Sequence, residues 1–402
     1  MIKQRVLISE VYEGLYDGPH ATPPTSDKGA VFLGISNITK NGHIDFSNIK
    51  YISEEDLPKW TKRVTPRAGD IVFSYEATLN LYAIIPESFW GCLGRRMALI
   101  RPDESKALGK YLYYYFFSDE WRATIAENTI TGATVDRIPI AKFPEFPISL
   151  PSLEIQKRIV DILSAYDYLI ENNQKQIKLL EEAAQRLYKE WFVDLRFPGH
   201  EDVQIVDGVP EGWRKTPFSQ KVDVMSGGTP KTSNPEYYNG SIPFYSPKDS
   251  SGAFFAFNTE THISQYGLDN CNSKLYPQGT VIITARGTVG KTTILAVPMA
   301  MNQSCYALKS DYFASVYYIF FALRQEIEAL KTMANGGVFD TIIVKTFDRI
   351  SILDPGKAII EKFDQAVSPF MGEIKNDMRK ITYLTEARDR LLPKLMSGEI
   401  EL

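Results

Sequence analysis

An internal repeat constrains this sequence more than any other feature. A shift of 204 residues places 132–143 on 336–347, and no gap is needed from about residue 111 to 192. Nearer the N-terminus a shift of 210 fits better and places 69–74 on 279–284. The globular parts therefore differ in length, whereas the segments that follow them do not. We interpret the two halves as diverged copies of one unit, a mixed globular domain followed by a long helix.

Each copy ends in a segment whose apolar residues are spaced as in a coiled coil. Residues 152–196 and a second segment from about 355 to 398 are each predicted to form one long helix. A lone helix of this length would leave an apolar stripe in water, so we expect an antiparallel coiled coil that relates the halves by a pseudo-two-fold axis. The predicted seam includes Ile159, Ile162, Tyr166, Leu169, Leu180, Leu187, Phe363, Phe370, Ile381 and Leu391.

Two polar residues, Asn173 and Asp377, occupy matching seam positions under the shift of 204. Two interpretations are open. Either these residues fix the register of the helix pair, or they lie where an extra step of four residues widens the seam.

The globular segments are predicted to be α+β domains. Residues 71–74 and 281–284 have the apolar composition of buried strands, whereas 109–127 and 313–333 are predicted to be helices. The chain then divides into a first globular domain at 1–150, a first helical segment at 151–200, a second globular domain at 201–354 and a second helical segment at 355–402.

Charge does not identify a partner. The chain has 45 Lys and Arg against 49 Asp and Glu, a formal net charge of −4. The basic and acidic side chains number 17 and 18 in residues 1–150, 7 and 8 in 151–200, 13 and 15 in 201–354, and 8 and 8 in 355–402. Because proteins that bind nucleic acids are usually basic, DNA binding cannot be inferred from charge, although a folded surface can still gather cations on one face.

Other residue types argue against several kinds of protein. No stretch of 18 apolar residues predicts a membrane span, and the first residues lack the apolar core of a signal peptide. Cys92, Cys271 and Cys305 are isolated, so we expect reduced core residues and a cytoplasmic location. Four histidines and no Cys-x-x-Cys predict no metal site, and no catalytic constellation of side chains is recognisable.

Two motifs are similar to sites of enzymes. Residues 285–292 fit a permissive nucleotide-binding P-loop, but residues 292–298 are β-branched and end in proline, so they predict a strand rather than the helix that a P-loop needs. We therefore expect a hairpin that presents Arg286 and Lys291. The segment Asn234-Pro-Glu-Tyr237 is similar to the Asn-Pro-Pro-Tyr motif of adenine methyltransferases, but no convincing glycine-rich cofactor loop accompanies it.

Together with the repeat, further motifs resemble the specificity subunit of type I restriction–modification systems over nearly the whole chain. The first helix, from 150–156 to 187–194, carries the strongest resemblance. Pro210-Glu-Gly-Trp213, Ser226-Gly-Gly-Thr-Pro230, residues 242–246 and Arg286-Gly-Thr-Val-Gly-Lys291 are similar to landmarks of a target recognition domain. The first globular domain departs from this pattern, because it lacks the Pro-x-Gly-Trp and Arg-Gly-x-x-Gly-Lys segments.

The resemblance implies a non-catalytic DNA-recognition subunit. Each globular domain would read one half of a bipartite, asymmetric site in double-stranded DNA, and the helix pair would set the spacer and dock two methyltransferase subunits. Those subunits would carry S-adenosylmethionine and methylate adenine, while motor–nuclease subunits would use ATP and magnesium. This chain would hold no cofactor, and partner subunits would supply much of the phosphate contact.

Geometry is compatible with this function. About 40 helical residues at 1.5 Å each give a rod of roughly 60 Å, and one turn of DNA spans about 34–36 Å. Arg and Lys suit guanine, whereas Asn and Gln suit adenine. The candidate DNA-binding residues are Lys231, Lys248, Arg286, Lys291, Asn302 and Gln303 in the second domain and Lys40, Tyr75, Arg95 and Arg96 in the first.

Two other functions compete with DNA recognition. A P-loop ATPase would bind ATP through Lys291, and a structural coiled-coil adaptor would not bind DNA.

Overall fold

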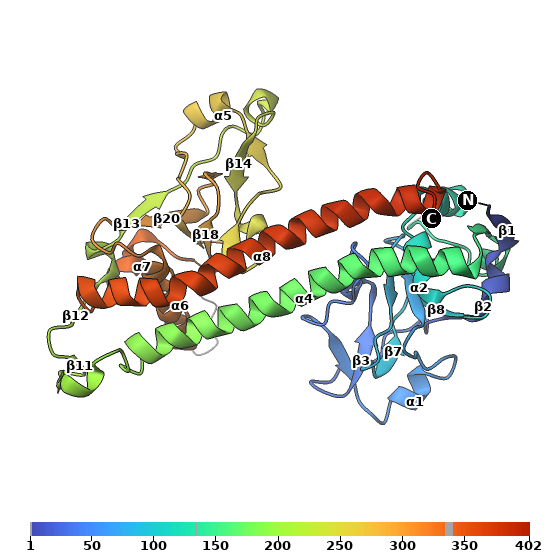
Figure 1. The fold of residues 1–402 in the computed structure, drawn as a ribbon, viewed down its shortest axis with the longest axis horizontal. Coiled ribbons are helices and arrows are strands. Elements are labelled where there is room, and N and C mark those ends of the chain that lie inside the picture. Colours follow the sequence, from blue (N-terminus) through green and yellow to red (C-terminus); the bar gives the residue numbers. More distant parts are fainter. Residues whose placement is uncertain (1, 133–134, 334–340) are drawn as a thin grey trace. The chain divides into compact units, whose positions relative to one another are not determined.

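The computed structural model describes residues 2–132, 135–333 and 341–402, which form two compact units. Unit 1 comprises Met1–Ile170 with Thr382–Leu402, and unit 2 comprises Glu171–Ile381. Each unit joins one globular domain to a part of both long helices, α4 (Leu153–Phe192) and α8 (Lys357–Ser397), which Figure 1 labels. Part of the repeat match, residues 133–134 and 336–340, lies outside the described residues.

Unit 1 contains two main sheets. One has the strand order β2-β8-β5-β6 with antiparallel neighbours, and the other has the order β4-β3-β7 with β3 and β7 parallel. β1 pairs with β9 in a third, two-stranded sheet. The elements are β1 (Gln4–Leu7), β2 (Tyr12–Asp17), β3 (Ala30–Leu33), β4 (Lys50–Ile52), α1 (Leu57–Trp60), β5 (Ile71–Ser74), β6 (Tyr82–Ile84), β7 (Gly91–Leu93), β8 (Met97–Pro102), α2 (Gly109–Tyr115), α3 (Asp119–Asn128) and β9 (Pro147–Leu150).

Unit 2 repeats this topology and adds one strand, β15, which pairs parallel with β18 in the larger sheet. Its main sheets have the orders β13-β20-β17-β18-β15 and β16-β14-β19, with β14 and β19 parallel, and β12 pairs with β21. The elements are β10 (Ile205–Val206), β11 (Val209–Pro210), β12 (Arg214–Pro217), β13 (Asp223–Ser226), β14 (Ile242–Tyr245), β15 (Phe255–Ala256), β16 (His262–Ile263), α5 (Gln265–Asp269), β17 (Val281–Thr284), β18 (Thr292–Leu295), β19 (Ala300–Met301), β20 (Cys305–Lys309), α6 (Val316–Met333), α7 (Val344–Arg349) and β21 (Ser351–Asp354).

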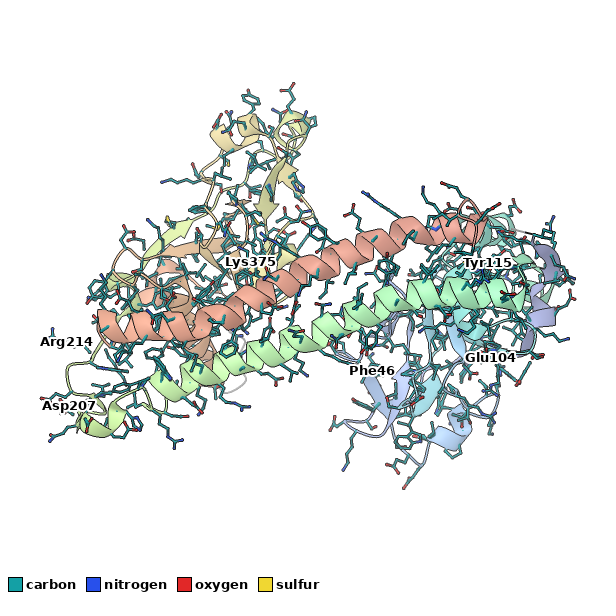
Figure 2. The ribbon with its side chains drawn as sticks, viewed as in Figure 1. Phe46, Glu104, Tyr115, Asp207, Arg214 and Lys375 are labelled. Carbon is teal, nitrogen blue, oxygen red and sulfur yellow. The ribbon has the colours of Figure 1, made fainter. Side chains whose placement is uncertain are left out.

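The predicted buried strands are confirmed. All four residues of β5 and all four of β17 are buried, and each strand lies between two others in its sheet. Aromatic side chains dominate the core of unit 1, where Tyr115 lies in the interior, whereas Phe46 is exposed (Figure 2). The Trp121 indole donates to the Tyr82 hydroxyl (2.9 Å), which satisfies two polar atoms that would otherwise be buried without a partner.

The predicted helix at 109–127 is wrong in one respect, because it is two helices, α2 and α3. Ser118 interrupts it, and the Ser118 hydroxyl accepts a hydrogen bond from the Trp121 amide (3.3 Å) as the N-cap of α3. In the second copy the aligned residue is Ala322, which cannot cap, and α6 continues from Val316 to Met333. The copies therefore differ at the position of this N-cap serine.

The first long helix also ends earlier than the predicted residue 196. α4 stops at Phe192, and Leu195 adopts a left-handed conformation (φ 57°). The Arg196 amide then donates to the Glu190 carbonyl (2.7 Å), which satisfies a carbonyl of the last helical turn. α8 ends at Ser397 as predicted, and Gly398 is left-handed there (φ 84°).

The two long helices pack antiparallel. In unit 1 the start of α4 shares a core with the end of α8, through Ile159 and Leu163 with Leu392 and Leu395. In unit 2 the end of α4 meets the start of α8, where the rings of Tyr188 and Phe363 lie 5.9 Å apart. The predicted coiled-coil pairing is therefore confirmed.

The predicted seam is offset in places from the most buried line of each helix. Ile159 and Phe363 are buried as expected, but Leu169 is 44% exposed while Ile170 is buried. Besides packing against each other, the two helices also pack against the globular domain within each unit. On α8, for example, Lys375, which is labelled in Figure 2, has its ammonium 6.0 Å from the centre of the Phe255 ring. The half-buried seam residues are Ile162, Tyr166, Leu180, Leu187, Phe370, Ile381 and Leu391.

Asn173 and Asp377 are both buried, with 8% and 0% exposure. One Asp377 carboxylate oxygen accepts from the Lys380 ammonium (2.7 Å), and within the described residues the other has no hydrogen-bond partner. A buried, half-satisfied carboxylate is costly, so Asp377 is not expected to add stability to the helix pair.

The helix pair is not symmetric in charge. In unit 1 the Arg388 guanidinium on α8 bonds the Asp167 carboxylate on α4 (2.7 Å), and the Tyr114 hydroxyl donates to the same carboxylate. The pseudo-two-fold equivalents in unit 2 are Ala184 and Met371, which are both fully buried. The same place in the repeat therefore carries an ion pair in one unit and an apolar contact in the other.

The hairpins β5–β6 and β17–β18 have the same backbone shape despite different sequences. Their turns, residues 75–81 and 285–291, are equally long. Ala77 and Asn80 are left-handed (φ 71° and 60°), as are Gly287 and Gly290 (φ 78° and 81°). The first hairpin therefore has left-handed residues that are not glycine, although this conformation normally favours glycine.

We predict that Arg388→Met lowers the free energy of unfolding by about 3 kcal/mol, because it leaves Asp167 largely buried without its cation. The Arg388 side chain is 11% exposed and that of Asp167 is 21% exposed. The matched control is Arg390→Met, since Arg390 is 77% exposed and pairs with Glu386 on the same helix. The control should change stability by less than about 0.5 kcal/mol. Equal losses in urea unfolding of the two variants would contradict the importance of the Asp167 pair.

Substitutions in the two hairpin turns should change the free energy of unfolding in opposite directions. Gly287→Ala should lower the free energy of unfolding by about 1 kcal/mol, because alanine is strained at positive φ. The added Cβ would meet Pro247 at 3.4 Å, an ordinary contact, so the backbone alone causes the loss. Ala77→Gly should raise stability by about 0.5 kcal/mol, since glycine relieves the strain but adds unfolded-state entropy. Thermal unfolding of both variants tests this pair, and a loss in Ala77→Gly would refute the strain at that position.

Candidate nucleic-acid interface

One edge of each globular domain gathers four connecting segments. The parallel strands β14 and β19 end at the same edge, followed by residues 246–252 and 302–304. The hairpin turn 285–291 lies beside them, because the Ala285 amide donates to the Ser304 carbonyl (2.7 Å). Residues 227–231 complete the edge, since the Gly228 amide donates to the Met301 carbonyl (3.1 Å). We call these four segments the loop edge of the second domain.

The first domain has an equivalent loop edge. Parallel strands β3 and β7 lead into residues 34–42 and 94–96, and the hairpin turn 75–81 follows β5. The Tyr75 amide donates to the Arg96 carbonyl (3.1 Å), and the Gly18 amide donates to the Met97 carbonyl (2.7 Å). The first domain's loop edge therefore comprises residues 18–20, 34–42, 75–81 and 94–96.

The structure brings the six candidate residues of the second domain together on its loop edge. Lys231, Lys248, Arg286 and Gln303 are exposed, and Asn302 is half-buried. Two of them are held by neighbours. The Thr229 hydroxyl donates to the Gln303 side-chain oxygen, and the Asn302 side-chain oxygen accepts from the Ser304 amide (3.0 Å). These bonds leave the amide N–H groups of both side chains to face a ligand.

Lys291 differs from the other candidates because its ammonium donates to the Ser250 carbonyl (3.2 Å). It also lines a cavity of about 420 Å³ with Tyr188 of α4 and with Phe321 and Arg324 of α6. Lys291 therefore lies at the inner side of the loop edge, beside the long helix. In unit 1, Lys40 of the segment after β3 lines a cavity of about 340 Å³ with Tyr113, Phe117 and Arg388.

In the first domain the structure separates the four candidates. Lys40 and Arg95 are exposed on the loop edge, and Arg96 is half-buried and pairs with Glu76 (3.4 Å). Tyr75 was predicted to contact DNA, but it is 7% exposed and packs in the core of unit 1. Burial raises the pKa of Tyr75, and nearby Asp17 and Glu76 raise it further, so the phenol stays neutral. Tyr75 has a large apolar ring and directly follows a buried strand, so its side chain packs in the core.

Several residues of the loop edges were missed by sequence reasoning. Glu76 stands beside Arg96, Thr229 orients Gln303, and the Thr288 hydroxyl donates to the Pro247 carbonyl (3.2 Å). No local motif marks them, because their neighbours come from other strands. The only available signal was the position of Glu76 and Thr288 in the two aligned hairpin turns.

The enzyme-like motifs have structural explanations. β17 and β18 form an antiparallel hairpin, as predicted, so residues 285–292 do not lead into the helix that a P-loop requires. Asn234 caps a short 3-10 turn, where its side-chain oxygen accepts from the Glu236 amide (3.1 Å). Both observations argue against the ATPase and the methyltransferase interpretations of these segments.

Two of the three cysteines are buried. Burial raises the pKa of the Cys92 and Cys305 thiols to about 12, so both remain protonated core residues as predicted. Cys271 is half-exposed rather than buried, because it lies in the turn after α5. Within residues 2–132, 135–333 and 341–402, no cluster of metal-ligating side chains is present. No helix in that part of the chain is long and apolar enough to cross a membrane.

Comparison with known proteins identifies the family. The family model of the type I restriction modification DNA specificity domain matches twice, at residues 25–182 and 210–376. The chain is 26% identical to the type I restriction enzyme HindI specificity subunit of Haemophilus influenzae, over 92% of this chain and 94% of that protein. It is also 26% identical to the MjaIX specificity subunit of Methanocaldococcus jannaschii, over 89% of this chain and 85% of that protein.

A solved structure has the same fold. The crystal structure of the type I restriction–modification system S subunit from M. genitalium covers 98% of this chain and 96% of its own length, with a TM-score of 0.58 and 15% sequence identity. Two matches of the family's domain, one on each half of the repeat, agree with the duplicated topology and with the predicted non-catalytic role. The chain therefore belongs to the type I restriction–modification DNA specificity family and carries its specificity domain twice.

Proposed function

We propose that this chain is the DNA-reading subunit of a type I restriction–modification complex, in which each loop edge reads one half of a bipartite, asymmetric site. The observation that carries the proposal is the pair of loop edges, which share backbone hydrogen bonds but present different side chains. Equivalent scaffolds suit equivalent positions against a duplex, whereas different side chains suit different base sequences.

The chemistry of the loop edges supports base readout rather than general attraction to phosphates. The second domain offers Arg286 and Lys248 for guanine, and Asn302 and Gln303 for adenine. Both amide side chains are oriented by neighbouring hydrogen bonds. Because the chain has a net charge of −4, we propose that much of the phosphate contact comes from partner subunits.

Those partners are proposed to be two methyltransferase subunits and motor–nuclease subunits. The relatives are named as specificity subunits of restriction enzymes, so the chemistry would reside on other chains. The methyltransferase subunits would bring S-adenosylmethionine, and the motor–nuclease subunits would bring ATP and magnesium. The helix pair is the proposed docking surface, since α4 and α8 are 40 and 41 residues long and contribute to both units.

The two-reader model predicts that the half-sites can be exchanged one at a time. Replacing residues 1–150 by the corresponding domain of another family member should change one half of the methylated sequence and leave the other half unchanged. Sequencing the methylated DNA of cells that hold the variant and its methyltransferase gives both halves and the spacer together. The control is the reciprocal exchange of residues 201–354, which should change only the other half.

Altered methylation in both halves after a single exchange would contradict independent readers. An adaptor without DNA contact would leave both halves unchanged in both exchanges, which would contradict the proposed function as a whole.

A further inference from the structure

The loop edges differ in where they carry positive charge. On the hairpin, Tyr75 and Ala285 are equivalent because each amide bonds the carbonyl of the residue before the next strand, that of Arg96 (3.1 Å) or Ser304 (2.7 Å). The following residue is Glu76 in the first domain and Arg286 in the second. One hairpin therefore presents a carboxylate where the other presents a guanidinium.

The segments that follow β7 and β19 differ in the opposite sense, because here the positive charge lies in the first domain. The Gly94 amide donates to the Leu33 carbonyl (2.7 Å), and the Asn302 amide donates to the Tyr245 carbonyl (2.9 Å). Because β3 pairs with β7 as β14 pairs with β19, Arg95 has the place of Gln303. Here the first domain carries the cation and the second carries a neutral amide.

Glu76 would repel DNA phosphates unless its charge were balanced. Arg96 provides this balance, since its Nε lies 3.4 Å from a Glu76 carboxylate oxygen, with side-chain exposures of 32% and 27%. Arg96 is also held in a left-handed conformation (φ 72°). The neighbouring residue Arg95 is exposed on the same loop edge. Of the two arginines, Arg96 thus positions the loop and Arg95 faces the solvent.

We infer that the two domains read guanine from different loops, the second domain through Arg286 of its hairpin and the first domain through Arg95 after β7. A guanidinium can bond O6 and N7 of guanine together, which is the commonest specific contact of arginine with a base. This inference rests on the proposed function and specifies the reading residues within it. Glu76 and Arg96 act as positioning residues for the first domain.

The test uses the full chain assembled with its methyltransferase and measures methylation of DNA substrates in which single half-site bases are varied. Arg95→Gln, which installs the residue type of the second domain, should lower methylation of the native site roughly 10- to 100-fold. The loss should be confined to one guanine position of the first half-site, where preference among bases should relax. Arg286→Gln should do the same in the other half-site.

Arg67→Gln is the matched control, because Arg67 is an exposed arginine of the same domain before β5, at the opposite end of that strand from the hairpin turn. It should leave both half-sites unchanged. Circular dichroism and thermal unfolding of each variant establish that the surface substitutions leave the fold intact.

The outcomes separate the inference from the function on which it rests. If Arg95→Gln leaves base preference unchanged while exchange of residues 1–150 still changes one half-site, Arg95 is not the reader and the two-reader model stands. A uniform loss across all substrates, without a change in base preference, would make Arg95 a phosphate contact and overturn the inference. If domain exchange also has no effect, the proposed function itself fails.

Discussion

Burial of two long apolar stripes is the constraint on which the rest of this structure depends. α4 and α8 have 40 and 41 residues, and each contributes to both units. Each unit solves the problem by packing part of both helices with its own domain, as the core shared by Ile159, Leu163, Leu392 and Leu395 illustrates. The apolar contacts along these helices therefore hold together segments from the two halves of the repeat.

Within this frame the two copies have diverged in charge as well as in length. Asp167 and Arg388 form an ion pair in unit 1 where Ala184 and Met371 are apolar in unit 2. An ion pair with low exposure adds little net stability over a well-packed apolar pair, but it penalises pairings in which one charge lacks its partner. The two ends of the helix pair therefore differ chemically. This difference suits a protein whose two DNA-recognition domains are not interchangeable.

Local patterns predicted much of the fold. The apolar runs 71–74 and 281–284 predicted buried strands. The proline after 292–297 predicted a second strand, and so a hairpin, although residues 285–292 fit a P-loop pattern. Errors arose where long-range packing decides. Leu169 was placed in the seam although it is exposed and its neighbour Ile170 is buried, and the Ser118 cap at the start of α3 was overlooked.

The candidate site was less predictable, because its equivalences follow hydrogen bonds rather than alignment. A shift of 210 matches the hairpin turns, but the same shift places Arg95 on Cys305, whereas the structure makes Arg95 equivalent to Gln303. The connection before β7 is two residues longer than the one before β19, and only the strand pairing reveals this. The burial of Tyr75 was also not foreseen, because it depends on how its ring packs in the core.

The left-handed turn residues of the first hairpin have an evolutionary consequence. Ala77 and Asn80 adopt the shape that Gly287 and Gly290 adopt in the second copy, so glycine is not required to form the turn. In the first copy the Ala77 amide is held by the Asp136 carbonyl (2.9 Å), a bond that does not depend on side-chain identity. The backbone of the turn therefore keeps this hydrogen bond when its side chains are replaced. Libraries that keep Ala77 and Asn80 and randomise the exposed position Thr78 between them would therefore explore new side chains without adding strain at positive φ.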